Sequence, residues 1–439
     1  MERPGIQRVV GSAIGSIALW LGAVSLLSAA ELAWADEPGT AALQAEIEVL
    51  KSRLTQLERQ VATGTTGIGE KPGLPGLLEL PSGLQGLGIS GYADVSYIYN
   101  FGEPSPNSTT GISTGRNNRG RAFDTEPNGF TPHAFELVLE KPITDQMPFG
   151  FRTDLFFGDD AEVFGAAGLG SATDEIELQQ AYITAKAPIG DGIDFKVGKF
   201  VTLLGAEVIE SPANWNFSRS YMFNYSIPFT HTGILASYPL GEFGSTTLGV
   251  VNGWERVDDN NKAKTLLGNL TLTPLEDLTL SVTGINGAEQ AGDSNDKRTV
   301  LDLVATYQAT DKLTLMANYD YGHESGVATA GTGEVGVNWT GLALYAKYDL
   351  TPTWSLAGRW EWFDDTDNAR TGFTSFGGGT PPDIDFQEWT LTNQWKLYEH
   401  VLARLEYRHD SADQRVFFHD TDGFAKYQDT VAAELVYHF

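Results

Sequence analysis

The sequence predicts an antiparallel transmembrane β-barrel of the outer-membrane type, with about 16 strands and a short α-helical coiled coil before it. The first observation is that from residue 88 to the last residue, segments of about ten residues alternate apolar and polar side chains, as expected of strands with one face toward lipid. The second is that short, turn-rich connections alternate with long ones. The third is an aromatic content of 11%, with aromatic residues placed near strand ends, where interfacial girdles lie.

Composition excludes several classes of function. The 439-residue chain carries 57 acidic residues against 29 Lys and Arg, a formal net charge of −28. Phosphate backbones are bound by clustered Lys and Arg, so nucleic acid is excluded as a partner. The absence of cysteine removes disulfides, thiolate metal sites and cysteine nucleophiles.

The N-terminus has the features of an export signal. Arg3 and Arg8 precede an uncharged stretch over 9–30, and the small-x-small sequence AWA at 33–35 follows it. This order predicts a signal peptide over 1–35, cleaved after Ala35. The alternative is a retained membrane anchor, because a helix of about 20 apolar residues spans a bilayer. Glycines and serines dilute the stretch, which favours cleavage.

Residues 36–61 are predicted to form a periplasmic coiled-coil segment. Apolar residues recur at alternating spacings of four and three, with charged residues between them. They are Leu43, Ile47, Leu50, Leu54, Leu57 and Val61. Such a seam predicts oligomerisation through partner helices. The alternative is an amphipathic helix that packs on its own domain. A Gly/Pro-rich linker over 62–87 follows, and the barrel is predicted over 88–439.

The strands of the predicted barrel follow from the alternation. In the first strand Val95, Tyr97 and Tyr99 lie on one face, and Asp94 and Ser96 on the other. The predicted strands lie near 92–101, 131–141, 149–158, 175–187, 193–202, 229–239, 245–254, 264–273, 277–286, 298–308, 312–321, 334–349, 353–363, 385–397, 400–409 and 430–439. An even number places both strand termini on the short-turn, periplasmic side. If one long strand is miscounted, the number becomes 14 or 18. A soluble propeller or tandem sandwich is the competing architecture.

One predicted strand contains a residue that does not fit. If Val197 and Val201 face lipid, Lys199 faces lipid as well, which would cost about 2–4 kcal/mol near the midplane. A β-bulge at Gly198 would turn Lys199 inward.

Four stretches carry a family resemblance: VGKF at 197–200, LGAE at 204–207, SPANWNFSR at 211–219 and NYSIPFTHTG at 224–233. The chain over most of 88–439 resembles the OmpL-like family of β-barrel porins. This resemblance implies a pore-forming outer-membrane protein and implies no defined solute. The coiled-coil segment lies outside it; in layout alone, that segment is similar to the periplasmic extensions of some sugar porins.

The predicted connection over 203–228 is too apolar to extend into solvent. We expect it to fold into the lumen as a pore constriction that presents Glu207, Glu210 and Arg219 to the path. The alternative is a packed surface loop that shields the barrel mouth or forms a subunit contact.

Charged residues on inward strand faces form the predicted pore lining. They are Asp94, Glu136, Arg152, Asp154, Arg359, Glu361, Arg404, Glu406 and Arg408. Several form acid–base pairs two residues apart, which either neutralise each other and stiffen the wall or create a transverse field across the channel. Acids exceed bases in the chain, so we expect a mild cation preference.

The sequence predicts no enzyme, no cofactor and no metal site. GISTG at 111–115 and GTGEVG at 331–336 match catalytic and dinucleotide-binding strings without the strand–turn–helix context that those sites need. His409 and Ser411 are only a nominal pair for a barrel-embedded lipase. Acidic loop runs do not complete a calcium-binding pattern.

The predicted function is that of an outer-membrane porin for passive diffusion of small hydrophilic solutes and ions. The expected partners are outer-membrane lipids and lipopolysaccharide, the diffusing solutes, and further copies of the chain in a homo-oligomer, with a trimer as the expected state. The alternative is a structural envelope protein whose barrel anchors a periplasmic coiled-coil tether.

Overall fold

The computed structural model describes residues 86–104, 117–169, 175–329, 333–373, 383–419 and 423–439. The predicted signal peptide, coiled-coil segment and all but the last two residues of the linker lie outside these ranges, as do the string at 111–115 and part of that at 331–336. Among the described residues, no helix combines the length and the apolar character needed to cross a membrane.

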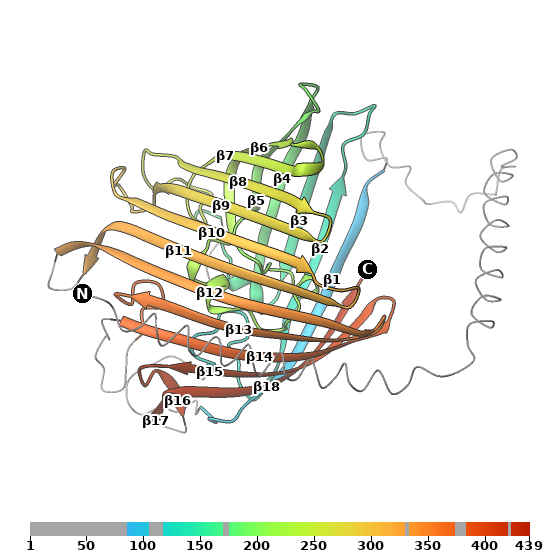
Figure 1. Cartoon of the computed structure of the whole chain (residues 1–439). Coiled ribbons are helices and arrows are strands. Elements are labelled where there is room, and N and C mark those ends of the chain that lie inside the picture. Colours follow the sequence, from blue (N-terminus) through green and yellow to red (C-terminus); the bar gives the residue numbers. More distant parts are fainter. Residues whose placement is uncertain (1–85, 105–116, 170–174, 330–332, 374–382, 420–422) are drawn as a thin grey trace, which may run out of the picture. The chain divides into compact units, whose positions relative to one another are not determined.

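Sixteen antiparallel strands form one closed barrel, in the order β1-β18-β15-β14-β13-β12-β11-β10-β9-β8-β7-β6-β5-β4-β3-β2 (Figure 1). The strands are β1 Gly88–Asn100, β2 Gly129–Lys141, β3 Phe149–Phe157, β4 Ile176–Ala187, β5 Ile193–Val201, β6 Thr230–Pro239, β7 Gly244–Val251, β8 Thr265–Leu275, β9 Leu278–Ala288, β10 Lys297–Gln308, β11 Leu313–Thr329, β12 Gly333–Thr351, β13 Trp354–Thr366, β14 Asp383–Tyr398, β15 Val401–Ala412 and β18 Tyr427–His438. The predicted architecture and strand number are therefore confirmed for the barrel.

The alternation read from the sequence sets which side chains face outward. In β1, Val95 is 39% exposed on the outer face, whereas Asp94 and Ser96 are 3% and 2% exposed on the inner face. The pairing of Val95 with Leu435 of β18, which is 47% exposed, continues this apolar outer face across the closure of the barrel. Side chains of successive residues point to opposite faces of a sheet, so the register fixes both surfaces at once.

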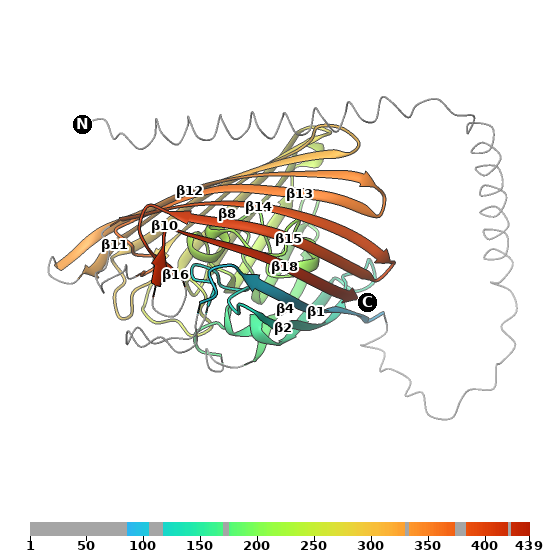
Figure 2. The ribbon, with the colours of Figure 1, turned by 90° about the horizontal axis from the view of Figure 1, so that it is seen from below.

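The two rims of the barrel differ, as predicted. The first strand, β1, begins and the last strand, β18, ends at the rim formed by the short turns. The C-terminus lies beside β1 at this rim (Figure 2). Connections at this rim include 276–277, 352–353, 399–400 and the 3₁₀ turn η5 Gly241–Phe243. The opposite rim carries the long connections, including 101–128, 158–175 with the 3₁₀ turn η2 Asp159–Glu162, and 202–229.

Several strand boundaries differ from the predicted ones. β11 extends well beyond its predicted end at 321, and a register shift between Glu324 and Val327 lies in the added part. That bulge interrupts the two-residue alternation, so the sequence pattern ends before the strand does. β12 begins one residue before its predicted start at 334 and ends two residues after its predicted end at 349. The connection before β18 also contains a small hairpin, β16 Phe417–His419 and β17 Gly423–Ala425, which the alternation does not predict.

The structure corrects the expectation for Lys199. Between the described residues of β5 and its two neighbours, pairing runs through Gly198 without a register shift, so the predicted bulge is absent. Lys199 is instead 5% exposed, and its ammonium donates to the Glu177 carboxylate and, at 2.7 Å, to the carbonyl of Leu178. The ion pair removes the cost of an unpaired charge in lipid. Gly198 has φ of +138° and touches the backbone of Ala181, a position that admits no side chain.

The apolar core lies inside the barrel. Aromatic residues of the long connections pack with inward-facing apolar residues of strands around the barrel, among them Phe156 of β3, Ile285 of β9 and Phe386 of β14. Tyr221 stacks on Phe386 of β14 with ring centroids 4.9 Å apart, and Phe123 and Phe223 pack at 5.8 Å. The interior of this barrel is thus partly filled by its own chain.

Candidate functional site

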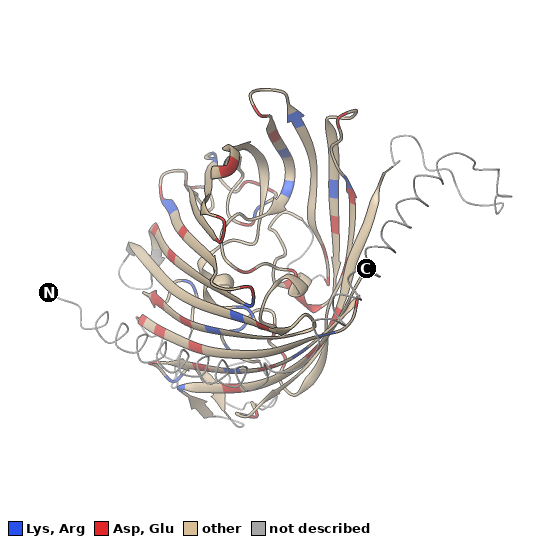
Figure 3. Ribbon diagram, turned by 45° about the vertical axis from the view of Figure 1, so that its right-hand side comes forward, with Lys and Arg blue, Asp and Glu red and all other residues tan. Residues whose placement is uncertain are grey.

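The connection between β5 and β6, residues 202–229, enters the barrel and contacts the strands on its far side. Its backbone includes the 3₁₀ turn η3 Ser211–Ala213 and the π-helical turn η4 Met222–Ser226. We refer to 202–229 as the lumen loop. Figure 3 looks toward the interior and shows chain crossing it, with charged positions on the surrounding strands. The hydrogen bonds of the lumen loop reach β11 to β15 and β18 on the far side, and also β4 and β9.

Two buried carboxylates of the wall hold the backbone of the lumen loop. Glu361 of β13 accepts hydrogen bonds from the N–H groups of Tyr221 and Met222, at 2.7 and 2.6 Å. Glu406 of β15 accepts from the N–H groups of residues 217–218, at 2.7 and 3.0 Å. A carboxylate that accepts two N–H groups satisfies donors that would otherwise be buried without partners.

Three buried guanidinium groups complement these carboxylates. Arg359, Arg404 and Arg408 are at most 2% exposed, and each donates to carbonyl oxygens of the lumen loop. The acceptors are the carbonyls of Ser211, Asn214, Ser218 and Arg219, at 2.6 to 3.1 Å. The wall therefore binds the loop through both its donors and its acceptors, which fixes the position of the chain in the barrel.

The charges of these anchors are paired. Arg359 lies 2.5 Å from both Glu207 of the lumen loop and Glu388 of β14. Arg404 lies 3.0 Å from Glu434, and Arg408 lies 2.8 Å from Asp410. A buried charge is tolerated when it is paired and hydrogen-bonded. Removal of one partner would leave the other charge buried and uncompensated.

The three residues predicted for the constriction all lie within the lumen loop. Glu207 is 6% exposed and accepts from the N–H of Ser220, in addition to its ion pair with Arg359. Arg219 is 1% exposed and donates to the carbonyls of Phe217 and Ile209.

Glu210 is only partly buried, unlike Glu207 and Arg219. Its carboxylate accepts from the Gln179 amide at 2.7 Å. Burial raises the pKa of Glu210, and hydrogen bonds from its own N–H and from Gln179 oppose that rise. Glu210 is therefore the more accessible of the two acids in this loop.

The charged residues predicted to line the pore occupy inward positions but differ in exposure. Arg152 keeps a side chain that is 28% exposed and bonds Asp154 at 2.9 Å. The others are at most 4% exposed: Asp94, Glu136, Asp154, Arg359, Glu361, Arg404, Glu406 and Arg408. The chain packed inside the barrel covers them. The structure therefore brings together the residues from β13 and β15 around the loop and places Arg152 apart from them.

Three further acids belong to the same group and are absent from the predicted set. Glu388, Asp410 and Glu434 are at most 4% exposed and pair with the arginines of the wall. Asp410 continues the two-residue series of inward charges in β15, so the alternation itself could have found it. Glu388 and Glu434 lie on inward positions of β14 and β18, and only the strand register connects them to the arginines.

The opposite part of the inner wall, from β6 to β10, has a different character. Near the short-turn rim its inward positions carry partly exposed neutral polar residues: Ser237, Asn269, Thr271, Ser281 and Thr306. Toward the long-loop rim the inward positions of the same strands are buried: Leu235, Leu267, Ile285, Val300 and Asp302. Asn269 donates to Ser281 at 2.8 Å, which links neighbouring strands without charge. The interior thus has charged strands covered by the lumen loop and, on β6 to β10, a neutral, hydrophilic stretch near the short-turn rim that remains accessible.

Two groups resemble catalytic arrangements. Ser96, His133 and Asp160 form a hydrogen-bonded chain, with 2.7 Å from serine to histidine and 2.9 Å from histidine to aspartate. All three are at most 2% exposed, and the ring of Phe217 packs against His133 at 5.4 Å, so the group fastens η2 and the loop to β1 and β2.

The nominal pair of His409 and Ser411 is not brought together. His409 binds Asp429 at 2.8 Å, whereas Ser411 donates to the carbonyl of Gln387 at 3.4 Å. Among the described residues, no group of three His, Cys, Asp or Glu residues is arranged to hold a metal ion.

Solved structures of outer-membrane channels share this fold. The outer membrane channel DcaP of Acinetobacter baumannii matches with a TM-score of 0.54 and 11% identity, over 80% of this chain and 97% of that one. The anion-selective porin from Comamonas acidovorans gives 0.54 and 11%, over 80% and 99%. OmpF of Salmonella typhi, solved with daunomycin, gives 0.51 and 11%, over 80% and 97%. At these identities the likeness shows the fold alone.

Sequence comparison identifies the family. Comparison with curated proteins gives no match. A family model described as "Putative beta-barrel porin-2, OmpL-like" matches residues 86–439, which is the whole barrel. The match agrees with the closed barrel of sixteen strands and with the resemblance seen in the sequence. The chain belongs to the OmpL-like family of outer-membrane β-barrel porins.

Proposed function

We propose that this porin allows passive diffusion of small hydrophilic solutes and ions across the outer membrane. The observation that carries the proposal is the uneven interior: the lumen loop covers the charged strands, and near the short-turn rim the wall from β6 to β10 keeps accessible neutral polar side chains. A hydrophilic wall without strong fixed charge suits solutes that must enter and leave without being retained.

Within this proposal the lumen loop forms the constriction. Its backbone is held by Glu361, Glu406 and the wall arginines, so the width of the path is set by a fixed segment. Glu207 and Arg219 act by holding the loop in place, because both are buried and bonded. Glu210 supplies the charge that solutes encounter. Replacing Glu207 and Glu210 by Gln is expected to change ion selectivity, and unchanged reversal potentials would contradict the assignment.

We further propose the mild cation preference expected from the acidic composition. The support is the excess of acids on the long-loop rim. The described acids there include Asp258, Asp259, Asp364, Asp367, Asp383, Asp385 and Asp413. Such a field raises the local concentration of cations at the outer entrance, more so at low salt.

Liposome swelling tests passive diffusion. Full-length mature protein is reconstituted in liposomes, and swelling is followed in isotonic solutions of uncharged sugars of increasing size. The proposal expects swelling rates that fall steeply with sugar size and do not saturate with concentration. Swelling no faster than that of protein-free liposomes, with a folded and heat-modifiable barrel, would contradict it.

The second candidate is a structural envelope protein in which the barrel anchors a periplasmic coiled-coil tether. The observation that favours it is the filling of the lumen by a firmly anchored loop. An occluded barrel, together with an envelope defect after removal of residues 36–61, would support this tether function. Homo-oligomerisation through that segment, with a trimer as the expected state, and contact with lipopolysaccharide belong to both proposals.

A further inference from the structure

We propose that the periplasmic vestibule of this porin contains a binding site for amphipathic organic anions, built by Lys347 and Lys396. This inference rests on the proposed function, because it names a class of solute that the channel would retain on its way. The site lies at the short-turn ends of β11 to β14, next to the anchor Arg404, which donates to the lining residue Gln394 at 3.0 Å.

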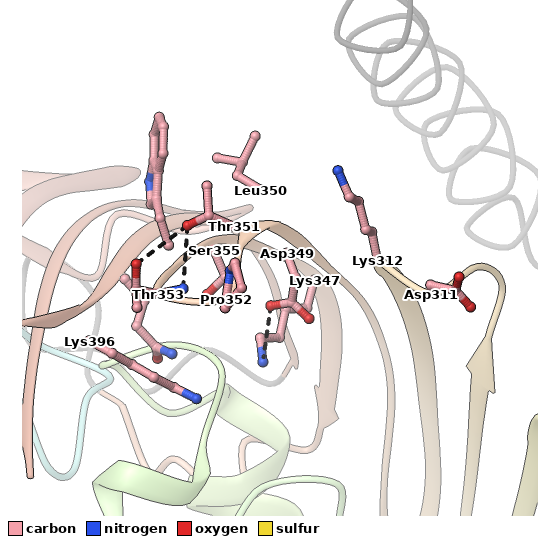
Figure 4. Close-up of a pocket in the computed structure, with 12 residues that line it drawn as sticks. Asp311, Lys312, Lys347, Asp349, Leu350, Thr351, Pro352, Thr353, Ser355 and Lys396 are labelled. Atoms are coloured by element: carbon pink, nitrogen blue, oxygen red, sulfur yellow. Dashed lines mark hydrogen bonds and ion pairs between the residues drawn. The ribbon is translucent and has the colours of Figure 1, made fainter. Parts of the chain in front are cut away.

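The structure has a hollow of about 540 Å³ at this rim. It is lined by residues of two turns, at 311–312 and 352–353, and by residues of β12, β13 and β14, shown in Figure 4. Three lysines, Lys312, Lys347 and Lys396, line it together with Asp311 and Asp349, so the charge of the lining is positive on balance. The volume is enough for a small organic molecule with part of its water.

The strand register places two of the lysines on the inner face. Lys396 pairs with Leu402, which is 6% exposed among the inward residues of β15. Lys347 pairs with Ala357, which is 2% exposed on the inner face of β13. Both side chains therefore project toward the lumen from strands on either side of β13, and Figure 4 shows them within the same hollow.

The two ammonium groups are available to a ligand. Among the described residues, Lys396 is exposed and its ammonium has no hydrogen bond or ion pair. Lys347 lies 3.6 Å from Asp349, and both side chains are partly exposed, at 26% and 45%. A pair of this length and exposure is weak and is readily exchanged for another anion. Most other lysines and arginines facing the interior are committed to closer or multiple partners.

An apolar surface lies next to the lysines. Tyr345 precedes Lys347 by two residues and so points to the same inner face, about 7 Å along the strand. The ring of Trp215 from the lumen loop packs edge-on against Tyr345, with centroids 6.4 Å apart, and Trp215 is partly exposed. Ala213 of the same loop is also exposed. An anion with a short hydrocarbon or aromatic body could thus place its charge on the lysines and its body toward Trp215.

The charge arrangement along the axis gives this site a role. The long-loop rim is acidic, and the short-turn rim also carries exposed acids such as Glu276, Asp277 and Glu399, but the lining of this hollow is positive on balance. Small cations remain favoured at the outer entrance, while organic anions that reach the vestibule are held there by a local site. Selectivity for small ions and retention of organic anions are therefore separate properties of this channel.

The test uses benzoate as the probe on full-length mature protein in planar bilayers. Benzoate is expected to reduce the KCl current in a saturable way, and uncharged benzamide at the same concentration is expected to leave it unchanged. In the double variant Lys347→Gln/Lys396→Gln, the concentration for half block should rise about tenfold or more, since two charge-assisted contacts are lost. Lys264→Gln, at the long-loop rim and paired with Asp259, is the matched control and should shift it less than twofold.

Equal block of the wild type and the double variant would overturn the proposal, and so would equal block by benzamide. Calorimetric titration of the detergent-solubilised protein with benzoate gives a readout that does not need a current. If the protein does not conduct but binds benzoate, and the double variant does not, the vestibule site stands and the diffusion function fails. If it conducts but binds no benzoate, the diffusion function stands and the site fails.

Discussion

Arg359 illustrates how individual residues hold the interior of this barrel together. Its guanidinium is fully buried and reaches two carboxylates, Glu207 and Glu388, and the carbonyl of Ser218. One residue thus joins the lumen loop to β13 and β14. Buried ion pairs contribute little compared with an apolar replacement of all partners, but loss of one partner is costly.

Replacing Arg359 by Gln is therefore expected to destabilise the folded barrel by about 3–5 kcal/mol, because two buried carboxylates lose their counter-charge. Urea-induced unfolding of the refolded protein in detergent micelles measures this. Arg256→Gln is the matched control, since Arg256 is partly exposed at the long-loop rim and should change stability by no more than about 0.5 kcal/mol. Equal losses in the two variants would show that Arg359 is not an anchor.

Glu210 gives a prediction for pH dependence. Burial raises the pKa of Glu210, so on acidification its negative charge is lost at a higher pH than that of an ordinary glutamate. The cation preference should therefore fall as the pH is lowered toward and through the raised pKa, and be fully present above it. Reversal potentials in a KCl gradient at several pH values measure this. In Glu210→Gln, the change in reversal potential over this pH range should vanish. If the change remains in this variant, other acids cause it.

The lumen loop is held against β12 by Trp339. The indole N–H of Trp339 donates to the Ser226 carbonyl of the loop at 3.2 Å. Gly322 of β11 lies directly beside this indole, and a Cβ at position 322 would be 1.9 Å from a ring atom of Trp339. The absence of a side chain at Gly322 therefore keeps Trp339 in contact with the loop.

Gly322→Ala should displace the indole, weaken the hold on the loop and cost about 1–3 kcal/mol through overpacking. Gly284→Ala is the matched control in a neighbouring region of the barrel, because a Cβ there meets only a backbone oxygen at 4.0 Å. Thermal unfolding of the two refolded variants measures the difference, and single-channel recordings should show larger current noise in Gly322→Ala alone. Indistinguishable variants would contradict this role of Trp339.

At the scale of elements, the sequence predicted the fold well, and its failures have physical causes. Alternation in β1 and β18 correctly separated outer from inner faces, because lipid contact imposes a strict two-residue period. The ends of β11 and the hairpin of β16 and β17 were missed, since a bulge and a short strand carry no sustained period. The apolar composition of 203–228 correctly indicated that this connection packs against the protein, and its bonds to Glu361 and Glu406 locate it inside the barrel.

The exposure of the site residues could not be predicted from the sequence. Glu361, Glu406 and Arg408 were placed correctly on inward faces, but the periodicity of a strand does not state whether water or another segment covers that face. Their burial results from contacts with residues 217–222, which are nearly 140 or more positions away in the chain. The pairing with Glu388 and Glu434 depends likewise on the register of neighbouring strands.

For the whole molecule, we expect the barrel and the predicted segment over 36–61 to have separable roles. The barrel closes on itself through β1 and β18, so its wall needs no partner to complete it. Deletion of 36–61 is expected to leave the unit conductance unchanged and to lower the oligomer mass, because the predicted heptad seam lies in that segment. Light scattering in detergent, together with planar-bilayer recording of the same preparation, measures both. Loss of conductance upon deletion would favour the tether account.

Single-channel recording of the refolded mature protein in planar bilayers under a salt gradient tests passive diffusion through this barrel. A fixed loop beside an accessible polar wall predicts discrete, ohmic current steps with a reversal potential that indicates a mild preference for cations. Silence from a folded, heat-modifiable barrel would contradict the diffusion function and show that the lumen loop closes the path.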